Sequence, residues 1–569
     1  MSGLENLKAF EARVDRAMED LPLFRLPIRA PVTGMAFMLH GLLHGYSATN
    51  SPPKPEAANS FAGRMAYLMP LLSKCPADPL GANAKDCLEA WLNEEQKHGT
   101  ATRFIAYAHF AELMPEVHRG YFDVSGDETK GFLLRHPSSK VSDAEAEDIL
   151  LAELALACVR PLANDYSQAF DNLAKTAPIL DVALSTEIQA ALASDFEASL
   201  FEMPLVSDNG LIAAAEVDHS QFKRFRCAVF ALSEFAIRLA QALGRLLVNE
   251  PENADVFNEM LEWVTICWDE SAVINFLRTV GHLTDAQAER LLALFGLDFR
   301  KQNRLLRHAA EGFFPPFVRV PGVIIVVPDF VKMFMQTRNL LYAVERTNSR
   351  LFDSLVSGDL EPELLKTVVD MLQSFPTLHA KPNVVWASGE IDLLVYDAGT
   401  NSALHLQAKA PLPPQGARMV QRLESRIAEG LNQLRKVREL SQGERDRIIG
   451  EAIGSTVSNV SLRDVILARS CFGTHSVRAD AQDVMLLTLP ILSGALNDCK
   501  ERGVSSLPDI LEQCTANVNT LVTHAKPHWS HETVIIEGVN LSVPLFHFDT
   551  SFVQAFRDHV WRGRNDMSI

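Results

Sequence analysis

Two short apolar segments between residues 389 and 410 carry polar side chains at alternate positions. In EIDLLVYD these include Glu390 and Asp392, and in ALHLQAKA they include Gln407 and Lys409. Carboxylate and amide oxygens are the ligands that a hard divalent cation such as Mg²⁺ takes, and Mn²⁺ accepts the same ligands. A lysine beside such an ion can stabilise negative charge or activate a water molecule. These residue types therefore indicate a cation site with a general base or electrophile alongside.

For this site to form, the two segments must be neighbouring β-strands. Successive side chains of a strand point to opposite faces, so Glu390 and Asp392 share one face, as do Gln407 and Lys409 on the next strand. The intervening DAGTNS is typical of a hairpin turn. If the strands pair, Asp392, Gln407 and Lys409 converge on one face beside Glu390. The alternative is an edge hairpin with one solvated polar face, which explains the alternation without chemistry.

The arrangement resembles the PD-(D/E)xK nuclease superfamily, whose core carries an Asp at the start of one strand and a Glu-x-Lys on its neighbour. Gln407-Ala408-Lys409 has a Gln-x-Lys form, which is similar to the Mrr-like branch of restriction endonucleases, enzymes that cut DNA with magnesium. The resemblance implies that Asp392 and Gln407 hold Mg²⁺ or Mn²⁺ with help from the carbonyl of Ala408. It also implies that Lys409 is the catalytic lysine, which orients or activates the attacking water.

The same resemblance implies an acidic residue on the helix that precedes the sheet. The segment EPELLKTVVDMLQSFP offers Glu363, which we prefer to Glu345, and Glu390 is a further candidate metal ligand. The chain departs from the superfamily at Ile391, where a Pro is expected before the catalytic Asp392, and at Val437, where an aromatic Tyr is expected on the following helix. The resemblance covers about 50 residues closely and residues 360–500 as a fold.

A helix is predicted directly after the lysine, from about residue 416 to residue 440. Its apolar residues recur at helical spacing and form one stripe: Val420, Leu423, Ile427, Leu431 and Leu434. The residues on the opposite side suit a phosphate backbone: Arg418, Arg422, Arg426, Gln433 and Lys436. The formal net charge of −18 argues against nucleic-acid binding over the whole surface, so any contact must be local. The alternative for this helix is a solvated polar face.

Residues 1–310 and 311–569 differ in their patterns. The first part is dominated by helical periodicity, and its apolar stretch FKRFRCAVFALSEFAIRLAQALGRLLVN predicts a central helix. Capping-box spacings in this part predict helix starts at Ser142/Glu145, Thr186/Gln189 and Thr284/Gln287. A Pro-Gly hairpin signal lies near residues 313–331, and from about 380 strands and helices alternate. We therefore expect a large, mainly α-helical N-terminal region followed by an α/β nuclease-like domain with a mixed central sheet flanked by helices.

The composition is that of an ordinary globular protein, with 569 residues of which 47% are hydrophobic and 22% are charged. The N-terminus lacks the apolar core of a signal peptide, and the longest apolar runs are shorter than the roughly 20 residues that span a bilayer. The eight cysteines are scattered without a C-x-x-C pair, which is typical of reduced thiols. We therefore expect a cytoplasmic protein without a membrane span.

Other groups of reactive residues are weaker candidates. His40 and His44 have an i, i+4 spacing that suits a metal, but the Glu of HExxH is missing. The segment THAKPHWSHE contains three more histidines, His524, His528 and His531. Pro527 interrupts the helical register there, which favours a loop. Cys471 and His475 have no identifiable oxyanion partner and are interpreted as core and loop residues. The sequence contains neither GxGxxG nor a P-loop motif, so we expect no built-in ATPase.

The preferred hypothesis is a Mg²⁺-dependent or Mn²⁺-dependent deoxyribonuclease, and analogy to its relatives suggests restriction or phage defence. Residues 1–310 would then sense or recognise a target, and would be the surface for a protein partner. The alternative is a catalytically inactive nuclease fold that serves as a nucleic-acid-binding or protein-interaction module. A third interpretation is a scaffold in which the helical half does the work and the hairpin is structural. The sequence leaves open whether the chain forms a homo-oligomer.

Overall fold

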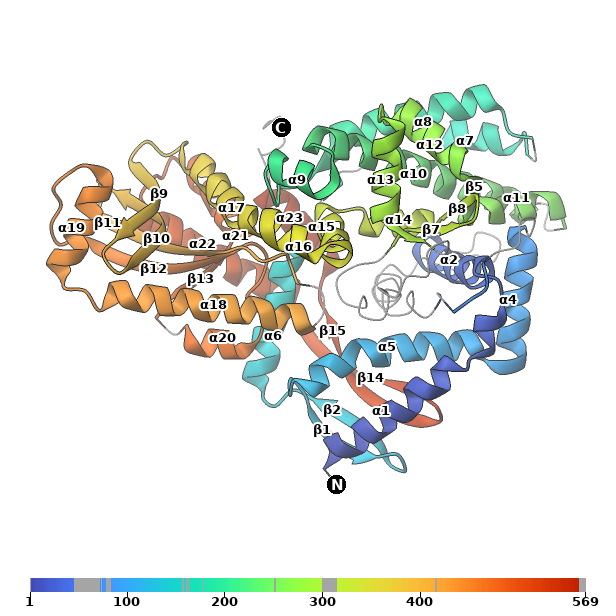
Figure 1. Cartoon of the computed structure of the whole chain (residues 1–569), viewed down its shortest axis with the longest axis horizontal. Helices are drawn as coiled ribbons and strands as arrows, with labels where there is room; N and C mark the ends of the chain where they lie inside the picture. The colour runs from blue at the N-terminus through green and yellow to red at the C-terminus, as the bar shows by residue number, and fades with distance from the viewer. Residues whose placement is uncertain are drawn as a thin grey trace.

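The computed structural model describes most of the chain, and the site and its surroundings lie within the described part. Its described ranges are 2–45, 74–77, 83–155, 158–159, 164–177, 179–249, 252–298, 315–414, 417–481 and 483–561, with Leu72 and Leu162. The class is mixed α/β, with helices dominating the N-terminal half and a mixed sheet in the C-terminal half, as expected from the sequence (Figure 1).

A five-stranded sheet forms the centre of the C-terminal half, in the order β13-β12-β11-β10-β9. Its strands are β9 (Leu378–Trp386), β10 (Gly389–Asp397), β11 (Ser402–Lys409), β12 (Ser461–Ala468) and β13 (Met485–Thr488). The first three are antiparallel neighbours, whereas β12 and β13 run parallel to β11. Every residue of β11, and every residue of β10 after Glu390, is buried, as in strands that are covered on both faces.

Helices cover both faces of this sheet (Figure 1). One face packs against α17 (Ser357–Leu372), α21 (Leu489–Glu501) and α22 (Leu507–Ala525). The other face packs against α18 (Ala417–Arg438) and α19 (Gln442–Ile453), and α20 (His475–Asp480) lies against α18. Leu394 and Tyr396 of β10 contact Val437 and Ile448 in the smaller cluster on this second face. The polar face predicted for β10 and β11 is therefore covered by α18 and α19.

A long central helix, α10 (His219–Asn249), organises the helical half, as the sequence predicts. Around it lie α7 (Ser167–Ala174), α8 (Val182–Ser199), α9 (Asp208–Ala215), α11 (Ala254–Val264), α12 (Glu270–Val280) and α13 (Asp285–Leu294). By length and composition α10 passes as a candidate membrane span, but 89% of the relevant window is buried inside the protein, as in a core helix. A second candidate among the described residues is bent by 102°, and combines Gly3–Arg25 with Arg29–His44.

A second sheet lies beneath this helical group, in the order β5-β8-β7-β6. Its strands are β5 (Ile266–Asp269), β6 (Gly296–Asp298), β7 (Phe317–Val320) and β8 (Val323–Val326), and α14 (Pro328–Phe334) and α15 (Thr337–Thr347) follow. Strands β7 and β8 are antiparallel neighbours joined at Pro321-Gly322, where Gly322 has a φ of +79°. The Pro-Gly hairpin is thus confirmed. A short helix α16 (Ser349–Leu351) and a π-helical turn (Phe352–Val356) then lead into α17.

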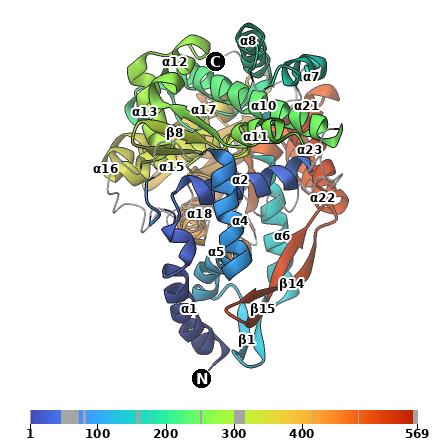
Figure 2. The ribbon, with the colours of Figure 1, turned by 90° about the vertical axis from the view of Figure 1, so that its right-hand side faces the viewer.

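A third sheet, in the order β1-β2-β15-β14, joins a hairpin from the N-terminal part of the chain to the C-terminal hairpin. The elements of this part are α1 (Gly3–Glu19), a 3₁₀ turn (Pro22–Arg25), α2 (Arg29–His44), α4 (Ala84–His98), α5 (Thr100–His118), β1 (Asp123–Asp127), β2 (Gly131–Arg135), α6 (Ser139–Leu154), β14 (His528–Ile536), β15 (Val539–His547) and α23 (Thr550–Val560). Strand β15 pairs in parallel with β2, and Figure 2 shows the red hairpin beside blue β1. A two-stranded pair, β3 (Cys158–Val159) with β4 (Leu200–Phe201), completes the strands.

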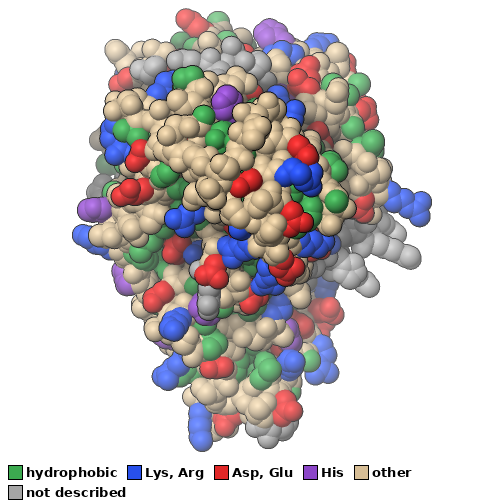
Figure 3. All heavy atoms as spheres, turned by 90° about the vertical axis from the view of Figure 1, so that its left-hand side faces the viewer, with side chains coloured by type: hydrophobic (Ala, Val, Ile, Leu, Met, Phe, Trp, Pro, Cys, Tyr) green, Lys and Arg blue, Asp and Glu red, His purple; other side chains and the backbone are tan. Residues whose placement is uncertain are grey.

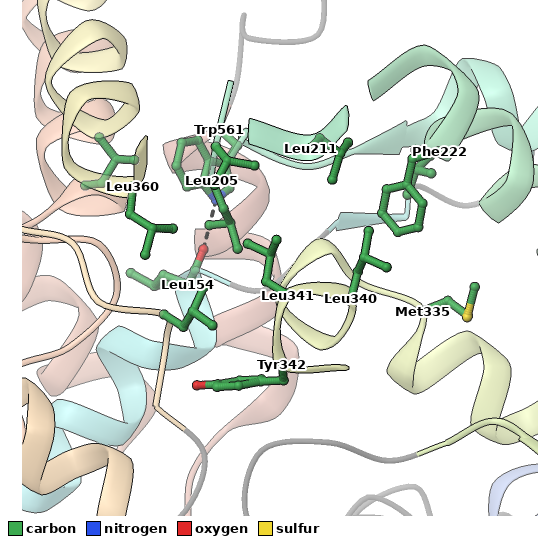
Figure 4. Packing of buried hydrophobic residues seen from close by; sticks show 14 of the residues in the cluster. Leu154, Leu205, Leu211, Phe222, Met335, Leu340, Leu341, Tyr342, Leu360 and Trp561 are labelled. Atoms are coloured by element: carbon green, nitrogen blue, oxygen red, sulfur yellow. Dashed lines mark hydrogen bonds between the residues drawn. The ribbon is translucent and has the colours of Figure 1, made fainter. Parts of the chain in front are cut away.

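The boundary predicted near residue 310 does not separate the packing units. The β5-β8-β7-β6 sheet draws strands from both sides of it, and the third sheet joins residues 123–135 to residues 528–547. The main core also runs across it, since the indole Nε1 of Trp561 donates to the carbonyl of Leu154 at 2.8 Å beside Leu341 and Leu360 (Figure 4). The sequence pattern changes at this point because the dominant element type changes, although the packing continues.

Candidate functional site

The five-stranded sheet opens between its two most buried strands. Backbone pairing between β10 and β11 ends at Leu393 opposite Leu406. Beyond this point β10 remains paired to β9, and β11 remains paired to β12 as far as Lys409. The next residues on the diverging strands are Asp392 and Gln407, so the two polar side chains enter the opening from opposite sides. We call this opening the β10–β11 fork.

Side chains take over the hydrogen bonding across the β10–β11 fork. The backbone N–H of Ala408 donates to Asp392 Oδ2 at 2.8 Å, and Gln407 Nε2 donates to the carbonyl of Glu390 at 3.1 Å. Lys409 Nζ lies 3.6 Å from the same Asp392 oxygen. Asp392 and Lys409 are only 7% and 8% exposed. The structure therefore brings Asp392, Gln407 and Lys409 together on one face, with the backbone of Glu390 beside them and its side chain exposed.

The amide oxygen of Gln407 has no hydrogen-bond partner among the described residues, although the whole residue is 0% exposed. The amide nitrogen faces two acceptors, the Glu390 carbonyl and, at 3.5 Å, His405 Nε2. Reversing the amide would place its oxygen against the Glu390 carbonyl, so this orientation is the favourable one. A buried acceptor without a donor is costly, and a hard cation is one group that would satisfy it. The residues present thus fit a divalent metal ion.

A second row of residues fixes Gln407 in this orientation. His405 Nδ1 lies 2.9 Å from Asp464 Oδ1, which favours the tautomer that donates from Nδ1 and leaves Nε2 as an acceptor. Asp464 also accepts from Arg438 of α18. Burial alone would raise the pKa of Asp464, but the hydrogen bonds and charges of His405 and Arg438 outweigh this effect and lower it. This row of hydrogen bonds from Arg438 to Gln407 supports the site, and nothing in the sequence around Asp464 except its strand position pointed to it.

The α17 carboxylate that interacts electrostatically with Asp392 and Lys409, and that shares a pocket with Lys409, is Glu361 and not the predicted Glu363. Burial raises the pKa of Glu361, and the charge of Asp392 raises it further, whereas Lys409 lowers it. Glu363 instead pairs with Lys366 at 3.7 Å and lies near the charge of Arg469. Two residues along a helix differ by about 200° in direction, so only one of them can face the sheet opening. The rotation of α17 about its axis, which the sequence does not determine, decides between Glu361 and Glu363.

Burial also raises the pKa of Asp392, and the nearby Glu390 charge adds to this effect. Lys409 and the Ala408 N–H oppose it without cancelling it. Asp392 and Glu361 are therefore two carboxyl groups that are costly to ionise side by side in the folded chain. A divalent cation between such groups relieves this cost, which is the electrostatic setting of a metal site.

Lys409 lines a pocket of about 830 Å³ at the end of β11, between the start of α17 and the first turns of α18. Its charged lining mixes both signs: Glu345, Glu361, Lys409, Arg422, Arg426 and Glu429. The pocket gives a substrate group access to the lysine side of the fork. On the face shown in Figure 3, basic and acidic side chains among the described residues are likewise interspersed.

The basic side of α18 is exposed as predicted, while the apolar stripe is buried from Leu423 to Leu434 and half-buried at Val420. Arg422 pairs with Glu345 at 2.8 Å and Arg426 with Glu429 at 3.0 Å. Gln433 and Lys436 are exposed further along the same side. The side chain of Arg418 lies outside the described residues. The face is thus cationic but partly neutralised by the helix itself and by α15.

Two of the weaker candidates from the sequence do not assemble into sites. His524 packs on Phe552, while His531 Nε2 lies 3.2 Å from the Leu134 carbonyl. His528 stacks on His547 with ring centroids 5.0 Å apart, so the three histidines face different neighbours. Cys471 is buried, and burial raises the pKa of its thiol, which disfavours a nucleophilic thiolate.

A comparison of the chain with known protein families, curated proteins and solved structures found no match. Function is therefore inferred from the geometry of the described residues.

Proposed function

We propose that the chain is a metal-dependent nuclease that hydrolyses phosphodiester bonds in DNA, with its active site at the β10–β11 fork. The observation that carries this proposal is the buried, unpartnered amide oxygen of Gln407 opposite the carboxylate of Asp392, with Lys409 beside it. The Gln-x-Lys resemblance to Mrr-like endonucleases supports DNA as the substrate. A role in restriction or phage defence rests on the same resemblance.

In this proposal Asp392, Gln407 and Glu361 would hold Mg²⁺ or Mn²⁺, and Glu390 would approach from solvent. The ion, when bound, would polarise the phosphate and lower the pKa of a water molecule. Lys409 keeps its ammonium within 3.6 Å of Asp392, where it stabilises negative charge that develops on the phosphate. Because Lys409 lines the pocket between α17 and α18, substrate would enter from that side.

The basic side of α18 would hold the nucleic-acid backbone next to the pocket. Arg422 and Arg426 line the pocket and are exposed, so each can exchange its glutamate partner for a phosphate. Exposed ion pairs of this kind contribute little stability, so the exchange is inexpensive in free energy. Gln433 and Lys436 extend the same side by two further turns.

The test is a cleavage assay on circular and linear DNA and RNA, with Mg²⁺, Mn²⁺ or a chelator, together with calorimetry of metal binding. Asp392→Ala should abolish both metal binding and cleavage, whereas Lys409→Ala should abolish cleavage and leave the ion bound. Gln407→Glu should retain the ion. Arg447→Ala is the matched control, because Arg447 is exposed in the same half and pairs only with Glu451 among the described residues. Absence of divalent binding to wild type, with no variant altering any cleavage, would refute the proposal.

The second candidate is a nuclease fold that binds nucleic acid or protein without cleaving. The neutral Gln407 and the low exposure of both Asp392 and Lys409 favour it, since they reduce the charge and access that catalysis needs. The same experiment separates the two functions. Binding of DNA that survives Asp392→Ala, in a chain that cleaves no substrate with either metal, would establish the binding module.

A further inference from the structure

Three potential metal ligands meet far from the β10–β11 fork, where α2 packs against α14. His40 and His44 lie one turn apart on α2, with ring centroids 4.7 Å apart. Asp329 comes from the first turn of α14, almost 300 residues later in the chain. Their ligand atoms all lie within 4.8 Å of one another. In Figure 1 these helices are at the right, whereas β10 and β11 are at the left.

Two of the distances between these atoms are close to those in a tetrahedral metal site. His40 Nδ1 lies 3.3 Å from Asp329 Oδ2, and His44 Nε2 lies 2.9 Å from Asp329 Oδ1. Zinc binds imidazole nitrogen and carboxylate oxygen at about 2.0–2.2 Å in tetrahedral geometry, which separates its ligand atoms by about 3.4 Å. Because all three ligand atoms already lie within 4.8 Å of one another, side-chain adjustments would bring them around an ion.

Asp329 is buried between the two histidines. It is 4% exposed, and among the described residues its ion-pair partners are His40 and His44. A carboxylate and two imidazoles in one buried cluster are a donor set for a divalent transition metal.

We propose that His40, His44 and Asp329 bind a divalent transition metal ion, with Zn²⁺ as the best match. Two imidazoles and one carboxylate suit Zn²⁺ or Fe²⁺, whereas Mg²⁺ takes mainly oxygen ligands and retains several waters. Three protein ligands leave a fourth position for water or a small ligand, and His44, 21% exposed in its side chain, marks the open side. The ion joins α2 to α14, and so fixes the N-terminal helices on the β7–β8 hairpin that precedes α14.

The test uses the full chain, stripped of metal with a chelator and carrying Asp392→Asn so that the fork does not compete. Zn²⁺ binding is followed by calorimetry, and Co²⁺ is used as a spectroscopic probe of coordination. One Zn²⁺ per chain is expected, with visible d–d absorption for Co²⁺ and a rise in melting temperature on Zn²⁺ addition. His44→Gln and Asp329→Asn should each weaken Zn²⁺ binding by about 100-fold or more.

The matched control is His118→Gln, because His118 forms a partly exposed histidine–carboxylate pair with Glu11 at 2.7 Å. This variant should bind Zn²⁺ as the parent does. Equal affinity in His44→Gln and His118→Gln would overturn the proposal, as would a Co²⁺ complex without d–d bands. His44 is at the exposed side of the cluster, so its variant carries the test even if Asp329→Asn fails to fold.

Discussion

Gly430 of α18 provides the sharpest test of the role proposed for Lys409, because it is where the helix passes over the lysine stem. A Cβ at this position would lie 2.7 Å from Lys409 Cε and 2.8 Å from Ile466 Cδ1. Gly430→Ala therefore pushes on Lys409 without changing any proposed metal ligand. Asp392 and Gln407 are not among the atoms that the added methyl group meets first.

The size of the effect follows from these distances. Non-bonded carbon atoms sit about 3.5–4.0 Å apart, so Lys409 Cε must move by roughly 0.8 Å or more. A misplacement of about 1 Å in a reacting group costs on the order of 100-fold in rate. Overpacking costs about 1–3 kcal/mol of stability, and replacing a helical glycine by alanine returns about 0.5–1 kcal/mol. The net change in the free energy of unfolding is therefore a loss of roughly 0–2.5 kcal/mol.

The assay combines single-turnover cleavage, Mg²⁺ or Mn²⁺ calorimetry and chemical denaturation of the same preparation. Gly430→Ala should cleave about 100-fold more slowly than wild type while binding the ion with unchanged affinity. Gly443→Ala in α19 is the control, since a Cβ there meets no described atom within 4 Å. It should gain about 0.5–1 kcal/mol in stability and leave cleavage unchanged.

If Gly430→Ala cleaved DNA at the wild-type rate while losing measurable stability, the position of Lys409 would not limit the reaction. A parallel loss of metal affinity would show that the methyl group distorts the whole fork. Either result would refute the reasoning that assigns metal binding to the strand residues and charge stabilisation to the lysine.

Three further predictions follow from the site. Glu361→Gln should weaken Mg²⁺ binding whereas Glu363→Gln should not, and equal effects in calorimetry would contradict the rotation of α17 described above. The pKa values of Asp392 and Glu361 are raised in the folded chain, so without metal the folded chain binds more protons than the unfolded chain. The stability that these two groups contribute is therefore lost as the pH rises through their folded-state pKa values. The free energy of unfolding of wild type, measured relative to that of Asp392→Asn, should fall as the pH rises. A difference that does not change with pH would exclude this titration. Reversing Arg422 and Arg426 to Glu should weaken DNA binding and flatten its salt dependence, while unchanged affinity across a salt series would mean a merely solvated face.

Local signals predicted the elements around the site well. Strand alternation placed Asp392 and Gln407 on one face, and the Pro321-Gly322 turn predicted the β7–β8 hairpin, because side-chain direction and turn chemistry are set by a few adjacent residues. The capping box at Thr284 is also confirmed. The other two helix starts were wrong by about one turn, since α6 is capped by Ser138 and α8 by Asp181. Each segment contains several residues that can cap a helix N-terminus, and tertiary packing determines which of them does so.

What the sequence could not supply is the relation between distant elements. The rotation of α17 about its axis, which turns Glu361 and not Glu363 to the site, depends on the core that the helix covers. Asp329 has no local motif, so its meeting with His40 and His44 follows only from the packing of α14 on α2. The boundary near residue 310 was likewise drawn from composition, which carries no information about long-range strand pairing.

The pairing of β15 with β2 has a consequence for biosynthesis. Leu541 lies opposite Phe132, so roughly 400 residues separate two strands of one sheet. At about 5–20 residues per second, a ribosome needs roughly 20–80 s to make that interval. During this time the edge of β2 at Phe132 and Leu133 lacks the strand that later pairs with it. The nascent chain therefore exposes this unpaired strand edge for tens of seconds, until the last hairpin emerges and covers it.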